Sequence, residues 1–240
     1  MVSDSNVWLL WSSAFLLPWA VLYWRFPEHR REMARMSLFT APFGLTEPLF
    51  VPEYWNPPSL FDLAGRTGFD LESLIFCFAI GGIGAVLFNV AARRDLAPMP
   101  AGTRHQSHHR YHRWALAAPV LILPPLYLLP WNPIYPAILA MLTGAAAAAA
   151  CRPDLTAKML GSGGLFLALY VILLAGLEWS APGYIDRVWN LGALTGVRFW
   201  GQPLEELLFA VSFGMYWAGL YEHFTWRRLV AAGHPRGAAR

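Results

Sequence analysis

The sequence is short of charge for its length. Only 14% of the 240 residues are charged, against about 25% in a typical soluble domain. It has two cysteines, Cys77 and Cys151, and both lie within or at the end of apolar runs, so no disulfide framework is expected. The opening MVSDSN has no basic region, and no signal peptide is expected from it. These shortages argue against a soluble enzyme and against a disulfide-rich secreted domain.

Two cofactor motifs are also missing. No GxGxxG follows a predicted strand, so no dinucleotide cofactor is expected. The chain has one lysine, Lys158, which lies at the start of an apolar stretch far from the last one. The last helix therefore offers no amine for a Schiff base, and a retinal protein is excluded.

One histidine-rich segment invites a metal site. The stretch RHQSHHRYHRW (104–114) would place His105 with His109, or His108 with His112, on one face of a helix. No Cys–His spacing in the sequence supports zinc. Because arginines surround the histidines, a basic patch against anionic headgroups is the simpler interpretation, and no metal is predicted.

Apolar and aromatic residues are abundant instead, at 56% and 15% of the chain. Seven apolar stretches approach the roughly 20 residues that a helix needs to cross hydrocarbon. They are approximately 7–26, 35–52, 69–91, 114–131, 133–151, 160–180 and 200–222. Prolines interrupt the second and fourth. The predicted fold class is an all-α polytopic membrane protein of about seven transmembrane helices.

The basic residues support this division. All the lysine and arginine residues except Arg66, Arg187 and Arg198 fall in connections on one side of the predicted bundle. Basic loops face the cytoplasm, so the N-terminus is predicted to lie outside and the C-terminus in the cytoplasm. We expect an integral protein of the bacterial cytoplasmic membrane.

A sequence repeat divides the chain. GFDLESLIF (68–76) and GQPLEELLF (201–209) agree at Gly, Leu, Glu, Leu and Phe, and each follows a Pro-x-Tyr loop with Trp-Asn nearby. The predicted organisation is a first three-helix repeat at 1–113, a linker helix at 114–131 and a second three-helix repeat at 132–240. Because one helix intervenes, the two repeats run parallel through the membrane, with a site expected between them.

Carboxyl groups cluster at the outer ends of the predicted helices. They are Glu47, Glu72, Glu178, Glu205 and Glu206. The ordinary interpretation is that such residues are solvated charges at helix N-termini. A carboxylate in hydrocarbon is costly, however, and two such groups occur at matching positions. Carboxyl groups that share a dry site divide into a protonated acid and an ionised base, and we therefore predict acid–base catalysis.

Aromatic residues surround these acids. They include Tyr54, Trp55, Trp131, Trp179, Tyr184, Trp189, Phe199 and Trp200. Trp and Tyr are common at membrane interfaces, which accounts for many of them. The alternative is a pocket whose ring faces stabilise a carbocation without reacting with it. We take Tyr54, Trp55, Trp179, Tyr184, Trp189 and Trp200 as candidate substrate-binding residues.

The Pro-Leu-Glu-Glu opening of the last helix, its Gly-x-x-Leu-Glu counterpart and the duplicated three-helix units resemble the membrane-integral lycopene cyclases. The resemblance covers about 7–226. It implies redox-neutral, cofactor-independent cyclisation of the ψ-ends of lycopene to β- or ε-rings. The acidic residues of the motif would be Glu205 and Glu206, with Glu72 as their counterpart. The first copy reads Asp70-Leu71-Glu72-Ser73, which leaves the catalytic role of the first half open.

The resulting hypothesis is that Glu205 or Glu206 protonates the terminal alkene and that Glu178 or Glu72 removes a ring proton. The expected partners are a carotenoid within the bilayer, the lipid membrane and, if the pathway is organised, other carotenoid-pathway enzymes; no nucleic acid is expected. Three alternatives remain open. They are a terpenoid or prenyl-quinone cyclase, a cyclase of elongated carotenoids, and a small-solute transporter with parallel three-helix repeats.

Overall fold

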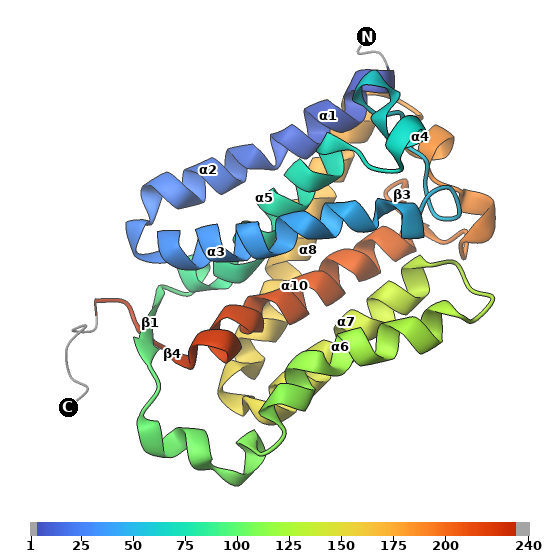
Figure 1. The fold of residues 1–240 in the computed structure, drawn as a ribbon. Helices are drawn as coiled ribbons and strands as arrows, with labels where there is room; N and C mark the ends of the chain where they lie inside the picture. Colours follow the sequence, from blue (N-terminus) through green and yellow to red (C-terminus); the bar gives the residue numbers. More distant parts are fainter. Residues whose placement is uncertain (1–3, 234–240) are drawn as a thin grey trace.

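The computed structural model describes residues 4–233, apart from the side chains of residues 101, 105 and 108, and this part of the chain is predominantly helical (Figure 1). The longer helices are α1 (Asp4–Ala14), α2 (Leu16–Arg25), α3 (Arg30–Thr40), α5 (Leu71–Ala91), α6 (His112–Tyr127), α7 (Ile134–Cys151), α8 (Thr156–Ser180) and α10 (Leu204–Thr225). Short helices and 3₁₀ turns connect them: η1 (Pro27–His29), η2 (Ala41–Leu49), η3 (Leu60–Asp62), α4 (Leu63–Thr67), η4 (Ala101–His105), η5 (Ser107–His109), η6 (Pro153–Leu155), α9 (Tyr184–Val188) and η7 (Leu191–Ala193).

Each predicted apolar stretch contains helix, and the departures have local causes. The stretch 35–52 begins as α3 and continues as the 3₁₀ segment η2, which contains Pro42 and Pro48. A proline lacks the N–H that an α-helix needs and clashes with the preceding turn, so the tighter 3₁₀ winding replaces it here. Helix α6 ends at Tyr127, earlier than the predicted 131, and contains three prolines.

Four helical stretches of the described chain are long and apolar enough to cross a membrane. They are Asp4–Arg25, Leu71–Ala91, Ile134–Cys151 and Pro153–Ser180. This agrees with the expectation of a helical membrane protein at the level of composition and length.

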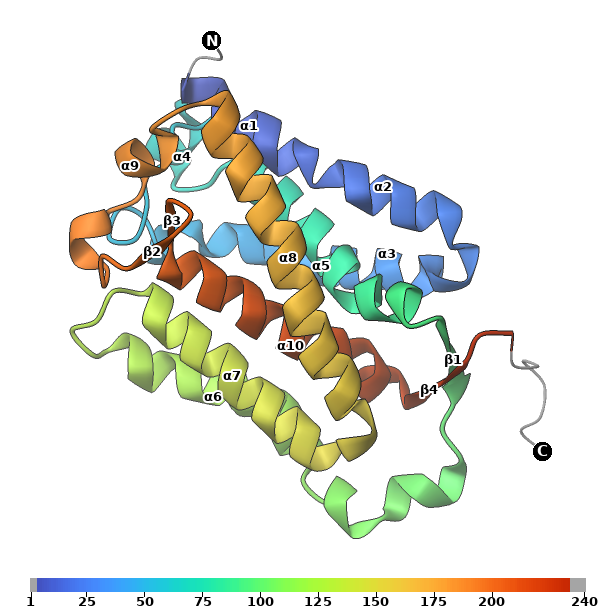
Figure 2. The ribbon, with the colours of Figure 1, turned by 180° about the vertical axis from the view of Figure 1, so that it is seen from behind.

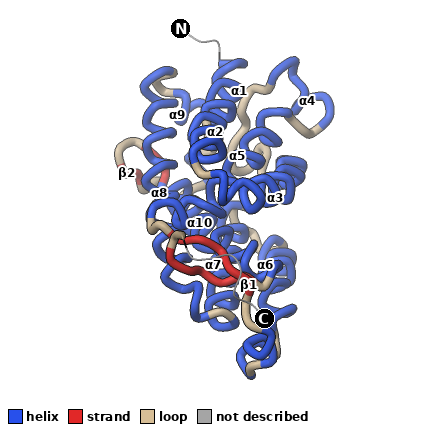
Figure 3. Tube along the Cα trace, turned by 90° about the vertical axis from the view of Figure 1, so that its left-hand side faces the viewer, coloured by secondary structure: helices blue, strands red, loops and turns tan. Residues whose placement is uncertain are grey.

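Two short antiparallel sheets add to the helices, although only helix was predicted. Strand β1 (Arg94–Pro98) pairs with β4 (Arg227–Ala231), and β2 (Arg198–Phe199) pairs with β3 (Gln202–Pro203) (Figure 3). The first sheet forms because α5 and α10 end side by side, each followed by a residue with positive φ, Arg93 at 50° and Trp226 at 51°. The left-handed residue redirects each chain out of its helix, and the two extended segments then satisfy one another's backbone groups.

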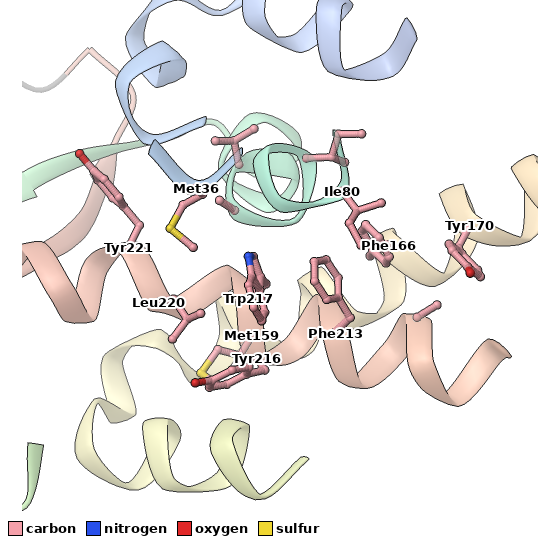
Figure 4. Packing of buried hydrophobic residues seen from close by; sticks show 14 of the residues in the cluster. Met36, Ile80, Met159, Phe166, Tyr170, Phe213, Tyr216, Trp217, Leu220 and Tyr221 are labelled. Atoms are coloured by element: carbon pink, nitrogen blue, oxygen red, sulfur yellow. The ribbon is translucent and has the colours of Figure 1, made fainter. Parts of the chain in front are cut away.

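Helix α10 lies at the centre of the bundle, with α8 crossing it on one side and α7 beside it (Figure 2). The crossing is close because a Cβ on Gly214 would lie 2.7 Å from the carbonyl oxygen of Ser162. Small residues allow such backbone approach between membrane helices. Figure 4 shows Phe213 and Trp217 of α10 directed toward α5, which carries Ile80. The N-terminal end of α10 lies near α9 and β3, and its C-terminal end lies near β1 and β4.

Candidate active site

A cavity of about 480 Å³ lies inside the bundle between the two halves of the chain. Its lining is overwhelmingly apolar and includes side chains from α1, η2, α5, α8 and α10. The aromatic residues of the lining are Trp8, Trp11, Phe15, Phe39, Phe43, Phe50, Tyr54, Trp55, Phe76, Tyr170, Trp189, Phe209, Phe213, Tyr216, Trp217 and Phe224. Only two carboxyl groups, those of Glu47 and Glu206, are among the described lining residues.

Glu206 is placed in the cavity by the start of α10. Pro203 precedes the helix in an extended conformation, and buried Gln202 donates a hydrogen bond from Nε2 to the Val171 carbonyl at 3.0 Å. This contact anchors the turn before α10 to α8. Glu206 then falls in the first helical turn, where the helix dipole favours a negative charge. The side chain is 4% exposed.

Three donors from other parts of the chain converge on the Glu206 carboxyl group. Tyr54 Oη and Trp189 Nε1 donate to Oε1, the latter at 2.6 Å, and Tyr170 Oη donates to Oε2 at 2.6 Å. Burial, with the neighbouring Glu206 charge as a second cause, raises the pKa of the Tyr54 phenol well above its usual range. Tyr54 therefore keeps its proton and remains a donor. Three donors around one carboxyl group stabilise its ionised form and act against the effect of burial, which favours the neutral form.

Glu47 presents the opposite environment. It lies on η2, is 7% exposed, and accepts a hydrogen bond from Ser73 Oγ to Oε2 at 3.0 Å, with the Trp55 side chain as a second donor. Its buried Oε1 has no hydrogen-bond partner among the described residues. A buried carboxylate with so few donors is costly, so this environment favours the neutral acid. Glu47 and Glu206 are thus two buried carboxyl groups in different hydrogen-bonding environments.

Close packing positions η2, and with it Glu47. A Cβ on Gly44 would lie 2.6 Å from the Leu74 amide nitrogen, which shows how closely the η2 backbone approaches α5. Ser73, the hydrogen-bond donor to Glu47, is in the same turn of α5.

Glu205 and Glu72 hold loops instead of facing the cavity. Glu205 Oε1 accepts from the Thr195 amide at 2.9 Å and from Tyr135 Oη at 2.7 Å. Glu72 Oε1 accepts from the Leu60 amide at 2.7 Å. In both cases the glutamate lies in the first turn of a long helix, and its carboxyl group binds the backbone of the loop that precedes the helix.

Glu178 has a similar local role. It lies near the end of α8 and accepts from the amides of Gly183 and Ile185, the latter at 3.2 Å. The loop that it organises contains Tyr184, which is fully buried but does not line the cavity. Burial raises the pKa of the Tyr184 phenol.

The structure therefore separates the predicted site residues into two groups. Those that line the cavity are Glu47, Glu206, Tyr54, Trp55 and Trp189. Those that lie away from it are Glu72, Glu178, Glu205, Trp179, Tyr184 and Trp200. Within the second group, the side chains of Trp179 and Trp200 are 85% and 88% exposed, as expected for residues at a membrane interface.

Tyr170 is a site residue that the sequence reasoning did not select. It lies in the middle of α8, and its hydroxyl donates to Glu206. The available signal was its position, since it is the one phenol in an apolar run of more than fifteen residues. A phenol buried at membrane depth requires a hydrogen-bond partner.

The loops of the two halves meet at the edge of the cavity. Trp55 and Trp189 form an antiparallel bridge, and their ring centroids are 5.4 Å apart. The Asn56 amide donates to the Val188 carbonyl at 2.8 Å, and the Asn190 amide donates to the Tyr54 carbonyl at 2.9 Å. These paired bonds place Tyr54 and Trp189 next to each other, where both reach Glu206.

The cavity also has an exposed side. Phe43 and Leu49 of η2 and Val120 of α6 line it, yet they are 46%, 39% and 72% exposed. All three side chains are apolar. The cavity is therefore open between η2 and α6, along helices predicted to face lipid.

Comparison with known proteins gives one family. Residues 132–224, which contain Tyr170, Trp189, Glu205 and Glu206, match the family model described as lycopene cyclase. No curated protein and no solved structure matches the chain.

Proposed function

We propose that this protein, whose match over 132–224 supports its assignment to the lycopene cyclase family, converts the ψ-ends of lycopene to β- or ε-rings. The observation that carries the proposal is the pair of differently solvated carboxyl groups, Glu47 and Glu206, in one aromatic-walled cavity. Cyclisation of this kind needs a proton donor, a proton acceptor and a dry cavity that tolerates a cation.

The roles follow from the hydrogen bonds. Glu47, with fewer donors than Glu206, is the proposed acid, because its neutral form can direct an O–H into the cavity. Glu206, held by Tyr54, Tyr170 and Trp189, is the proposed base. The hypothesis from sequence had assigned the acid to Glu205 or Glu206 and the base to Glu178 or Glu72. The contacts of Glu72, Glu178 and Glu205 with loop amides favour the new assignment.

The proposed reaction conserves atoms and charge. The Glu47 proton adds to the terminal alkene and leaves a tertiary cation, which the next trisubstituted alkene attacks to close a six-membered ring. Glu206 then takes a proton from the carbon next to the new cationic centre, which restores a double bond. The proton on Glu206 must return to Glu47 before the next turnover. No electrons enter or leave.

The aromatic walls have a specific part in this scheme. Phe213 and Trp217 stack on each other with centroids 4.9 Å apart, and both line the cavity. Their ring faces attract a cation by about 0.5–2 kcal/mol each without forming a bond to it. The opening between η2 and α6 is the proposed entry for the carotenoid, because the substrate resides in the bilayer and the exposed lining there is apolar.

We also propose that the chain crosses the membrane seven times as two parallel three-helix repeats joined by α6. Several features recur at a separation of 133 residues: the loop-binding Glu72 and Glu205, the left-handed Arg93 and Trp226, and the strands that follow these two. The antiparallel bridge between Trp55 and Trp189 is consistent with a pseudo-twofold axis between the repeats. With this arrangement the basic connections lie in the cytoplasm of a bacterial cell.

Expression of the wild-type chain in a lycopene-producing bacterial host tests the proposed function. Chromatography of the pigments should show monocyclic or bicyclic carotenoids at the expense of lycopene. Membrane fractions of the expressing strain should contain the protein. Lycopene that remains entirely acyclic, with the protein folded in the membrane, would refute the proposal. The chromatogram also distinguishes β- from ε-rings and one ring from two.

A further inference from the structure

A second cluster of chemically active side chains lies at the other end of α10 from Glu206. Cys151, the last residue of α7, has its Sγ 3.6 Å from His109 Nδ1 and 3.4 Å from His112 Nδ1. The three donor atoms all lie within 4.8 Å of one another. His112 stacks on Trp226, which follows α10, so the cluster is about 25–30 Å from Glu206 at 1.5 Å rise per residue.

Both Nδ1 atoms face the same sulfur atom. Without a metal, the thiol can donate its proton to one imidazole while its sulfur accepts from the N–H of the other. The same distances also fit metal coordination. In a tetrahedral zinc site, with Zn–S about 2.3 Å and Zn–N about 2.0–2.1 Å, a sulfur and a nitrogen ligand lie about 3.5 Å apart. The two observed distances lie on either side of this value.

We propose that Cys151, His109 and His112 bind a Zn²⁺ ion, with the fourth position open to water. One thiolate and two imidazoles form a donor set suited to zinc. The sequence spacing suggested different histidine pairs and gave no role to Cys151, which is 39 residues beyond His112. The tertiary fold brings it to them.

The surroundings support metal binding. Cys151 and His109 are buried, 4% and 6% exposed, so the site is largely protected from water. The His112 ring lies between Trp226, at 4.3 Å and 24° to it, and His223, at 5.4 Å and 19°. A hydrogen bond with the backbone of His223 also acts on this imidazole. Such outer contacts fix the orientation of a ligating histidine.

The charge balance is also suitable. The neighbouring Arg152 is held by Asp154 through two hydrogen bonds at 2.8 and 2.7 Å, so its charge is compensated. A bound zinc ion would tie the long connection before α6 to the end of α7. It would thereby hold α6, which carries part of the cavity lining, independently of the chemistry proposed there.

Cobalt is the probe for this site. The full-length protein, purified in detergent and freed of metal with a chelator, is titrated with Co²⁺. We expect one equivalent to give a thiolate-to-cobalt charge-transfer band and the visible bands of tetrahedral cobalt, and Zn²⁺ to abolish both. Elemental analysis of the protein as purified should find about one zinc per chain.

Variants assign the ligands. Cys151→Ser, a nearly isosteric change, should remove the charge-transfer band and weaken Co²⁺ binding at least tenfold. His112→Ala should weaken it at least tenfold, and His109→Cys should strengthen the charge-transfer band by adding a second thiolate. Cys77→Ser is the matched control and should retain the wild-type spectrum. Size-exclusion profiles establish that each variant is folded.

Absence of a charge-transfer band in the wild-type protein would overturn the proposal, as would an undiminished band in Cys151→Ser. Both readouts are independent of pigment formation. If the protein binds no cobalt, the proposed cyclase activity is not affected. If the protein forms no cyclic pigment, metal binding can still be tested.

Discussion

Adjacent glutamates at the start of α10 have different tasks, which only their contacts reveal. Glu205 matches Glu72 in the proposed repeat, and each accepts a hydrogen bond from a backbone amide of the loop before its helix. Glu206 matches Ser73 and has no acidic counterpart in the first half. The shared glutamate is thus a structural feature of both halves. The additional one, Glu206, is the group that reaches the cavity.

Replacing Glu206 by Gln should stop ring formation. The amide cannot accept the ring proton, and its NH₂ group adds a donor to a site that already holds three. We expect product to fall by at least about 10²-fold with the protein still present in membranes. Pigment chromatography and immunoblots of the lycopene-producing strain measure both quantities.

Glu205→Gln is the matched comparison. It should retain ring formation above one tenth of wild type, while melting at lower temperature because the amide of Thr195 loses a charged acceptor. Equal loss of product in both variants without instability in Glu205→Gln would contradict the separation of roles.

The assignment of acid and base has its own isotopic test. Glu47→Gln removes the proton donor, so lycopene incubated with this variant in D₂O should remain free of deuterium. Glu206→Gln keeps the donor but lacks the base, so Glu47 can deliver and recover a proton repeatedly. Deuterium should then enter the end groups of the recovered lycopene. Mass spectrometry of the extracted pigment measures it, and the reverse labelling pattern would exchange the two roles.

At the scale of elements, the irregular segment η2 is what brings an acid to the cavity. Its prolines prevent a regular α-helix, and Gly44 allows its backbone to lie against α5. The same segment carries Glu47 and the exposed Phe43 at the proposed entry.

Gly44→Ala should therefore damage the site through packing. The added Cβ would lie 2.6–2.8 Å from backbone atoms of Ser73 and Leu74, which cannot move aside cheaply. We expect a destabilisation of about 1–3 kcal/mol and at least tenfold less cyclic product. Gly164→Ala on α8, where nothing lies within 4 Å, is the control and should behave as wild type. Melting curves in detergent and pigment yields report the two effects.

Helices α3, α8 and α10 are joined away from the cavity by a buried ion network. Lys158, fully buried, bonds Glu222 at 2.5 Å and Glu32 at 3.4 Å, and Asn89 donates to Glu32 at 3.1 Å. Glu222 pairs with this lysine, whereas Glu32 also lies 3.6 Å from His29 Nδ1. Removing the lysine leaves carboxyl charge uncompensated in a low-dielectric interior.

Lys158→Met is accordingly expected to cost about 3–5 kcal/mol of stability. The double variant Lys158→Met, Glu222→Gln should recover a large part of that loss, because one buried charge disappears with its partner. Thermal unfolding of the purified proteins gives both values. A double variant no more stable than the single one would show that the lysine acts through packing of its alkyl chain.

At the scale of the whole molecule, the site exists only because two halves meet. Glu47 and Tyr54 come from the first half, and Tyr170, Trp189 and Glu206 come from the second. Strand β1 pairs with β4 at one end of the bundle (Figures 1 and 3). The Trp55 and Trp189 loops pair elsewhere, beside the cavity, so the halves are joined at two places. Arg94 of β1 and Arg227 and Arg228 of β4 lie at the β1–β4 end.

That distribution leads to a topological prediction. A fluorescent protein fused to the C-terminus should fluoresce, because the C-terminus is expected in the cytoplasm. Alkaline phosphatase inserted after Gly196, an exposed loop position with open space around it, should be active because it would lie outside. A C-terminal fusion that does not fluoresce, together with an inactive phosphatase at 196, would show that the protein has the opposite orientation.

The sequence by itself determined the helical, apolar character of the protein and its division into apolar stretches. It also indicated the importance of the loop around Trp55 and of the start of α10. They follow from composition, from hydrophobic length and from the cost of a carboxyl group in hydrocarbon, all of which are properties of the chain itself. The tertiary structure alone decided which glutamate faces the cavity and that Tyr170 donates to Glu206. It also decided that Cys151 lies beside His109 and His112. Adjacent residues on a helix point about 100° apart, and contacts across 36 to 42 residues depend on how helices pack, which no local pattern encodes.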